Sequence, residues 1–280
     1  MRNWATAVVL GLGVGVGVQM STAAPLLQYT YDEASGDALD TGTGTPANGV
    51  LTGATRTTDT PSGTGAALNL VSASPAFVNT AGDVDKLDTL SQFTLSTWIN
   101  LDTGGAGSDR LLSKQGGGSF PGFMWNINNP VAGGDRAAGD VNTGLFVGGS
   151  TAFAFATSDA NVNLLDKWVF LAVSYDGTQT VDNTRFYVGG LNTPVAQLGS
   201  TKTINAGTTT DDAARFGVGF TDAAPTADVS PDGYFDDTRV YGEALNAAGL
   251  ETVRLANVPE PTSVAVLALG AVGLMARRRR

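Results

Sequence analysis

The 280-residue sequence contains no cysteine and no histidine. Without cysteine it has no disulfides, so an exported chain of this composition must be stabilised by packing or by a bound metal. The absence of histidine excludes Ser-His-Asp and Cys-His catalysis, and it also excludes zinc sites with histidine ligands. Calcium, which is bound by oxygen atoms, is the metal that remains to be considered.

Basic residues are scarce in the middle of the chain. Of the 16 lysines and arginines, Arg2 and residues 277–280 lie at the two ends, which hold one of the 26 acids, Glu260. Residues 25–257 therefore carry 11 basic and 25 acidic side chains, a formal charge of −14. A domain of this charge repels nucleic acid and anionic membrane, so neither is expected as a partner.

The N-terminus has the order of a secretory signal peptide. Arg2 is followed by an apolar run at residues 5–18 and by small residues at 21–24. The pattern predicts a signal peptide at residues 1–23. We expect signal peptidase to cut after Ala23 rather than Ala24, because a cut after Ala24 would place Pro25 directly behind it. A retained membrane anchor is the alternative.

The C-terminus combines a proline pair, an apolar stretch at residues 264–276 and a basic end. The apolar stretch is shorter than the ~20 residues that span a bilayer comfortably. The positive-inside rule keeps the terminal arginines in the cytoplasm. The residues concerned are Pro259, Glu260 and Pro261, followed at the end by Arg277, Arg278, Arg279 and Arg280.

This order resembles the PEP-CTERM sorting tail of Gram-negative bacteria. The resemblance covers residues 258–280 and implies that the tail enters the inner membrane transiently. It further implies that an exosortase cuts near the proline pair and that the protein then reaches the cell surface or the extracellular matrix. A tail anchor that is never cut is the alternative.

Between the two ends, short alternating runs indicate β-strands. Residues 92–101 place Phe93, Leu95 and Ile99 on one face. Residues 244–255 are expected to be helical with Asn246 as the cap, and the Thr/Gly-rich residues 41–65 are expected to be a loop. The other predicted strands are residues 26–31, 110–114, 122–127, 144–156, 168–175, 185–188, 215–220 and 233–241. Glycine-containing turns separate them, which predicts a single all-β antiparallel sandwich over residues 25–257.

Several segments resemble, in order, the strands of laminin-G-like, concanavalin A-like domains. They are F-T-L-S-T-W-I at 93–99, L-L-S-K at 111–114, W-V-F-L-A-V-S-Y-D-G at 168–177, R-F-Y-V-G-G at 185–190 and G-Y-F-D-D-T-R-V-Y at 233–241. The resemblance implies a two-sheet jelly roll with one short C-terminal helix, between terminal targeting helices, and often a binding role.

Acidic residues at the first and last strands are candidate calcium ligands. Asp32 follows the first predicted strand, and Asp236 and Asp237 lie on the last one. The first and last strands are commonly neighbours in the fold that the resemblance implies, so these carboxylates are expected to meet. Alternatively, Asp236 caps a turn or pairs with Arg239.

A sugar-binding site is a second candidate. Trp125 is the tryptophan expected to be exposed, because glycines and Pro121 nearby indicate a loop rim, while Trp168 is expected in the core. The amides of Asn126 and Asn128 suit sugar hydroxyls. A tryptophan on a sheet is more often part of a core, which is the alternative for Trp125.

Enzyme activity is not expected. Jelly-roll glycoside hydrolases need two carboxylates ~5–10 Å apart, which on one strand requires acids at i and i+2. Asp236 and Asp237 are adjacent and would point to opposite faces, and Asp83 and Asp85 lie in a turn-like segment. The sequence predicts a surface or matrix module that binds glycan or protein. A purely structural matrix protein and a polysaccharide hydrolase or lyase are the alternatives.

Overall fold

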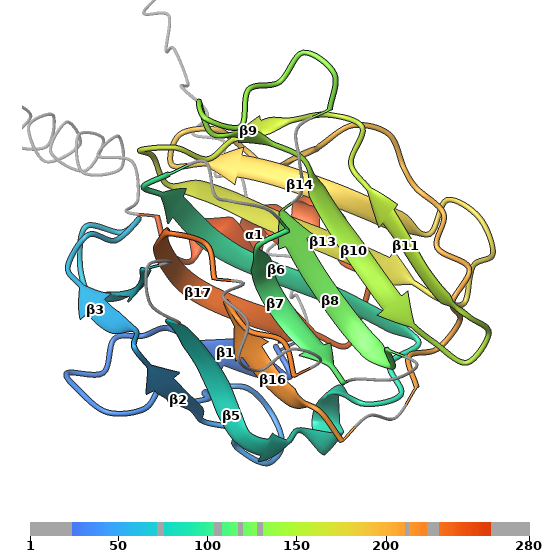
Figure 1. Cartoon of the computed structure of the whole chain (residues 1–280), viewed down its shortest axis with the longest axis horizontal. Coiled ribbons are helices and arrows are strands. Elements are labelled where there is room, and N and C mark those ends of the chain that lie inside the picture. The colour runs from blue at the N-terminus through green and yellow to red at the C-terminus, as the bar shows by residue number, and fades with distance from the viewer. Residues whose placement is uncertain are drawn as a thin grey trace, which may run out of the picture.

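The computed structural model describes residues 24–71, 76–103, 108–116, 120–127, 131–210, 213–222 and 230–258. Within these residues the chain forms two antiparallel sheets packed face to face. Figure 1 shows the second sheet in front of the first, with the helix α1 behind both.

The first sheet has eight strands in the order β15-β14-β13-β6-β17-β4-β3, and β1 also pairs with β17. All of its strand pairs are antiparallel. The strands are β1 (Leu27–Tyr29), β3 (Thr55–Thr57), β4 (Ala67–Leu70), β6 (Gln92–Leu101), β13 (Val169–Asp176), β14 (Thr184–Gly190), β15 (Ala196–Gln197) and β17 (Gly233–Tyr241).

The second sheet has seven antiparallel strands in the order β11-β10-β8-β7-β16-β5-β2. They are β2 (Gly49–Thr52), β5 (Phe77–Asp83), β7 (Arg110–Gln115), β8 (Gly122–Ile127), β10 (Thr143–Gly148), β11 (Phe153–Thr157) and β16 (Arg215–Val218). A separate pair joins β9 (Asp140–Val141) to β12 (Val162–Asn163), and the helical elements are η1 (Asp85–Leu87) and α1 (Ala247–Leu255).

The main core lies between the two sheets. On β6, the side chains of Leu95 and Ile99 are fully buried, as the alternation predicts. Phe93 of the same strand stacks on Phe123 of the facing sheet, with ring centroids 5.1 Å apart. Because burying one such side chain stabilises the fold by roughly 1.5–3 kcal/mol, this layer fixes which face of each strand points inward.

The outer face of the first sheet carries a second apolar cluster. Trp98 of β6 and Phe170 of β13 are register partners, and their rings meet edge to face at 5.5 Å. Leu250 of α1 is buried in the same cluster. The helix begins at Ala247, three residues after the predicted start, and Asn246 caps it as predicted, because its side chain accepts a 3.0 Å hydrogen bond from the amide of Gly249.

Two charged residues of α1 tie the helix to the loop between β14 and β15. Arg254 is 4% exposed and donates to the carbonyl oxygens of Gly190 at 2.6 Å and Leu191 at 3.2 Å. Glu251 pairs with Arg254 at 2.7 Å and accepts a 2.8 Å hydrogen bond from the amide of Val195. The helix therefore positions this loop.

The predicted fold class is confirmed, but two local predictions are wrong. Residues 144–156 do not form one strand, because β10 and β11 are joined there by a hairpin. Residues 41–65 are not all loop, since they contain β2 and β3. Both strands are short, and exposed residues on them hide the alternation.

The predicted boundaries of the signal peptide and sorting tail stay predictions. The expected terminal helices lie outside the described residues. In the described part of the chain, no helix is both long enough and apolar enough to cross a membrane.

Candidate functional site

Two of the three acids predicted to meet at the first and last strands border the same cavity. Asp32 and Asp236 line one cavity of about 480 Å³, which we call the acidic pocket. Its other lining residues are Thr30, Ser62, Thr64, Gly65 and residues 256–258. The pocket is thus built from both ends of the domain, as expected from the pairing of β1 with β17.

A β-bulge shapes the closing strand beside this pocket. The register between β17 and β6 shifts between Asp236 and Arg239, and Asp237 has a left-handed φ of 46°. The carboxylate of Asp237 accepts hydrogen bonds from Gln28 at 3.0 Å and Arg239 at 2.8 Å, two residues paired on the outer face. The expectation that Asp236 and Asp237 point to opposite faces is therefore wrong, because it assumed a regular strand.

Burial and mutual repulsion disfavour the charged forms of these acids. The pKa of Asp236 is raised to about 8, first by burial and then by the charge of Asp237. The pKa of Asp237 is also raised by burial, against the opposing effect of Arg239. In the described structure, Oδ2 of Asp237 is buried and has no hydrogen-bond partner. A cation beside these carboxylates would offset both the cost of burying their charges and the repulsion between them.

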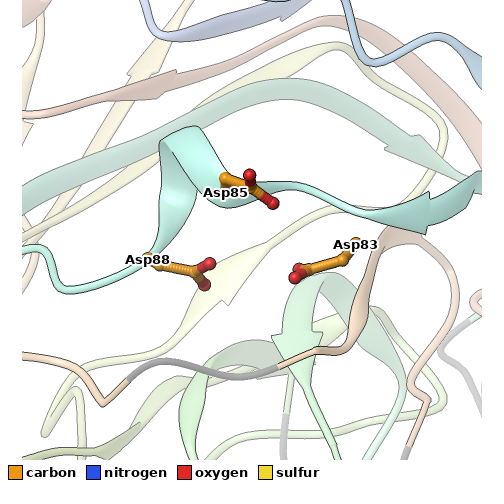
Figure 2. Close-up of side chains that lie close together, drawn as sticks. All are labelled: Asp83, Asp85 and Asp88. Atoms are coloured by element: carbon orange, nitrogen blue, oxygen red, sulfur yellow. The ribbon is translucent and has the colours of Figure 1, made fainter.

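A second acidic cluster was not predicted as a metal site. The carboxylate oxygens of Asp83, Asp85 and Asp88 lie within 4.8 Å of one another (Figure 2). Asp83 ends β5, Asp85 lies in η1 and Asp88 follows it. Among the described residues this is the one trio gathered so closely, so the carboxylates of the predicted calcium trio are farther apart.

An ammonium group already neutralises part of this second cluster. Lys114 of β7 is 1% exposed, pairs with Asp83 at 3.0 Å and forms a short ion pair with Asp88. Three carboxylates at this spacing can hold a metal, and here Lys114 supplies positive charge to two of them.

The predicted exposure of Trp125 is wrong. The side chain of Trp125 is fully buried in the main core, where its Nε1 donates a 2.5 Å hydrogen bond to Oγ1 of Thr143. Asn126 is 1% exposed, and Asn128 lies outside the described residues. The nearby glycines and Pro121 indicated a loop rim, whereas Trp125 lies within β8, between β7 and β10.

A larger cavity lies at one end of the first sheet, and we call it the end cleft. Its volume is about 730 Å³. It lies between the segment before β13 and the loop that joins β14 to β15, with Asn100 and Asp59 completing the wall. The lining residues are 162–163, 166–169, 188–194 and 196, with Asp59 and Asn100.

Trp168 gives the end cleft an aromatic wall. Its Nε1 donates a 2.9 Å hydrogen bond to Oδ1 of Asp59, which orients the indole ring. The ring of Tyr234 lies beside it, with centroids 6.4 Å apart. Trp168 is 8% exposed and packs in the outer apolar cluster, as expected, but it also borders a cavity, which the sequence did not reveal.

One polar group in the end cleft lacks a partner. Asn100 is 8% exposed, and its Oδ1 forms no hydrogen bond within the described structure. A buried amide oxygen without a donor costs roughly 1–3 kcal/mol, so this residue at the cleft wall is one that a structure does not leave unpaired without cost.

An exposed aromatic surface lies on the second sheet. Phe153 and Phe155 of the edge strand β11 are 43% and 60% exposed. Phe146 of β10 stacks against both rings, at 6.0 Å and 5.0 Å. Rings at such a surface can also contact a ligand, so this surface competes with the end cleft as a binding site.

The predicted sorting and cleavage residues lie outside the described part of the chain. They are Ala23, Pro259, Glu260, Pro261, Arg277, Arg278, Arg279 and Arg280. The PEP-CTERM protein-sorting motif nevertheless matches residues 257–280. This motif indicates export and surface sorting in Gram-negative bacteria, and processing by an exosortase.

Solved structures with a similar fold include binding domains. The binding domain of Paraclostridial Mosquitocidal Protein 1 is 15% identical with a TM-score of 0.54, over 82% of this chain and 51% of that one. The binding domain of botulinum neurotoxin serotype D/C is 10% identical with a TM-score of 0.56, over 84% of this chain and 53% of that one. This protein therefore spans about half the length of each of these toxin chains.

A third similar structure is that of domain 4 of AbnA, an extracellular arabinanase from Geobacillus stearothermophilus, in complex with arabinotriose. It is 16% identical with a TM-score of 0.54, over 83% of this chain and 98% of that one. At these identities the likeness shows the fold alone.

No curated protein matches this sequence. The family model of the concanavalin A-like lectin/glucanases superfamily matches residues 63–250, which is more than half of the chain. Together with the two stacked sheets, this match shows that the chain belongs to the concanavalin A-like lectin/glucanases superfamily.

Proposed function

We propose that this protein is an exported, non-enzymatic module that binds polysaccharide at the cell surface or in the extracellular matrix. The end cleft is the observation that carries the proposal. It combines a tryptophan wall, a buried amide oxygen without a donor and a volume of about 730 Å³. Cavities of ~300–1,000 Å³ with a few polar groups on apolar walls are typical of small-ligand sites.

The comparisons support a saccharide as the ligand. Domain 4 of AbnA, which shares the fold, was solved with arabinotriose. The sorting motif supports release outside the cell after an exosortase removes the tail.

The carboxylates of the end cleft support binding rather than hydrolysis. Glycoside hydrolysis needs a carboxylic acid that stays protonated, which proteins obtain by burial. Asp59 and Asp166, the carboxylates that line the cleft, are both exposed to solvent.

Binding of the purified full-length chain to a panel of polysaccharides by affinity electrophoresis tests the function. The expected result is retarded migration that weakens in Trp168→Phe, which alters the wall of the cleft but keeps an aromatic core residue. The matched variant Phe155→Ala alters the exposed phenylalanines. If Phe155→Ala abolishes binding and Trp168→Phe does not, the site lies on β11. Release of reducing sugar from any polysaccharide would contradict the non-enzymatic role.

We also propose that the acidic pocket binds calcium through Asp32 and Asp236. The two acids that line the pocket and the raised pKa of Asp236 both fit a cation at this place. Bound calcium would brace the two ends of the domain, and it would raise the melting temperature. The test is a thermal melt in calcium and in chelator. An equal melting temperature in the two conditions, or an unchanged calcium response in Asp32→Asn, would refute the site.

A further inference from the structure

The end cleft offers hydrogen-bond acceptors to a ligand. Asp59 and Asp166 line it, together with the amide residue Asn100. Lys167 is the basic residue among the described lining residues. A ligand that matches these groups must therefore be rich in donors, such as hydroxyl and ammonium groups.

Two more carboxylates surround the same place. Asp102 lies close enough to Asp232, Asp166 and Asp59 to feel their charges. Burial, and then these charges, raise the pKa of Asp102. Tyr234 hydrogen-bonds to Asp102 and places its ring beside Trp168. The negative charge thus gathers around two aromatic rings, an arrangement that attracts cations.

Among the described residues, Lys167 is the basic residue that lines the cleft, so these charges are only partly offset. None of Asp59, Asp102, Asp166 and Asp232 forms an ion pair within the described part of the chain. Asp166 also adopts a left-handed φ of 53°, fixed by a 3.0 Å hydrogen bond from its amide to the carbonyl of Leu101. Such a conformation costs free energy and persists where the surrounding structure imposes it.

We infer that the end cleft selects saccharides that carry protonated amino groups, that is, polymers containing 2-amino-2-deoxy sugars. This inference rests on the proposed function and names its ligand class. The ammonium group of a protonated amino sugar carries three N–H donors for the carboxylates of the cleft. Its apolar ring face can lie against Trp168. Uronic acid polymers would bring negative charge to an already negative cleft.

The test compares glucosamine hexamers with N-acetylglucosamine hexamers of equal length and with oligogalacturonate. Titration calorimetry of the full-length chain at mildly acidic pH keeps the amino groups protonated. We expect the glucosamine hexamer to bind roughly tenfold more tightly than the acetylated one, with a difference that shrinks in salt. Oligogalacturonate should not bind.

Charge-neutralising variants locate the effect. Asp59→Asn and Asp166→Asn should each weaken binding of the glucosamine hexamer about threefold, in the range of exposed charge pairs, and should weaken binding of the acetylated hexamer less. Asp182→Asn is the matched control, because Asp182 is exposed, has a φ of 52° like Asp166, and does not line the end cleft.

Each outcome has one meaning. The selectivity is refuted if the glucosamine and N-acetylglucosamine hexamers bind with equal affinity and neither Asp59→Asn nor Asp166→Asn changes that affinity. This result leaves the proposed function intact. A lysine pentapeptide that binds as tightly as the glucosamine hexamer would show a general cation site and also overturn the inference. Failure to bind any saccharide would contradict the proposed function itself.

Discussion

Replacing Lys114 by methionine tests how the second acidic cluster is held together. Methionine keeps much of the length of the side chain but removes the ammonium group that pairs with Asp83 and Asp88. Breaking a buried ion pair by removing one partner costs ~3–5 kcal/mol. The side chain of Asp83 is 33% exposed and that of Asp88 is 12% exposed, so solvent screens part of the loss.

We therefore expect Lys114→Met to lower the free energy of unfolding by about 3 kcal/mol, at the lower end of that range. For a domain of this size, the loss corresponds to a fall of roughly 6–12 °C in melting temperature. Lys202→Met is the matched control. The ion pair of Lys202 with Asp159 is more exposed, at 23% and 48%, so its loss should destabilise the fold much less than the loss of the Lys114 pairs.

The same variant should acquire a response to calcium. Without the ammonium group, the carboxylates of Asp83, Asp85 and Asp88, whose oxygens lie within 4.8 Å of one another, should bind a divalent cation more strongly. Calcium at ten times its dissociation constant would restore about 1.4 kcal/mol. The assay is a thermal melt with calcium and with chelator, compared with the unaltered chain. This reasoning is refuted if Lys114→Met melts at the same temperature as the unaltered chain. It is also refuted if calcium raises the melting temperature of the variant no more than it raises that of the unaltered chain.

Three further predictions concern other parts of the structure. In chelator, the free energy of unfolding should fall as the pH rises from about 4 to about 8, because folded Asp236 holds its proton more tightly than the unfolded chain does. The fall is at most ~5 kcal/mol, and urea melts of Asp236→Asn should show a flatter profile. Trp125→Phe should cost about 2–3 kcal/mol through lost volume and the lost bond to Thr143, without changing saccharide affinity in calorimetry. Arg254→Ala should cost about 2–3 kcal/mol and also weaken saccharide binding, because the loop that lines the end cleft loses its ties to α1; unchanged affinity would separate that loop from the site.

The sequence predicted the sandwich because its central strands alternate strongly. In β6, the residues that alternate in the sequence are those buried between the sheets, so the pattern and the packing agree. The same logic failed for β2 and β3, where exposed residues carry no burial signal.

The candidate sites were harder to predict than the strands. The meeting of Asp32 and Asp236 followed from the neighbouring first and last strands. The bulge at Asp237 had no signal in the sequence, since adjacent acids in a regular strand point apart.

The end cleft could not be read from any one motif. Asp59, Asn100, Trp168 and the loop at 188–194 come from four separate parts of the chain and meet only through the sheet order. Trp168 lies at the start of an apolar strand, so its pattern indicated only a core residue.

The place of β17 in the first sheet bears on how the protein folds during export. An exported chain crosses the membrane N-terminus first, so β1, β4 and β6 emerge long before their shared partner β17. Gln28 and Asp237, which are hydrogen-bonded in the folded protein, lie 209 residues apart in the sequence. Until β17 has crossed, β4 and β6 cannot be joined, and contacts between such distant residues form slowly. The centre of the first sheet can therefore close only after nearly the whole domain is available, so the joining of β1, β4 and β6 through β17 is expected to be a late step of folding.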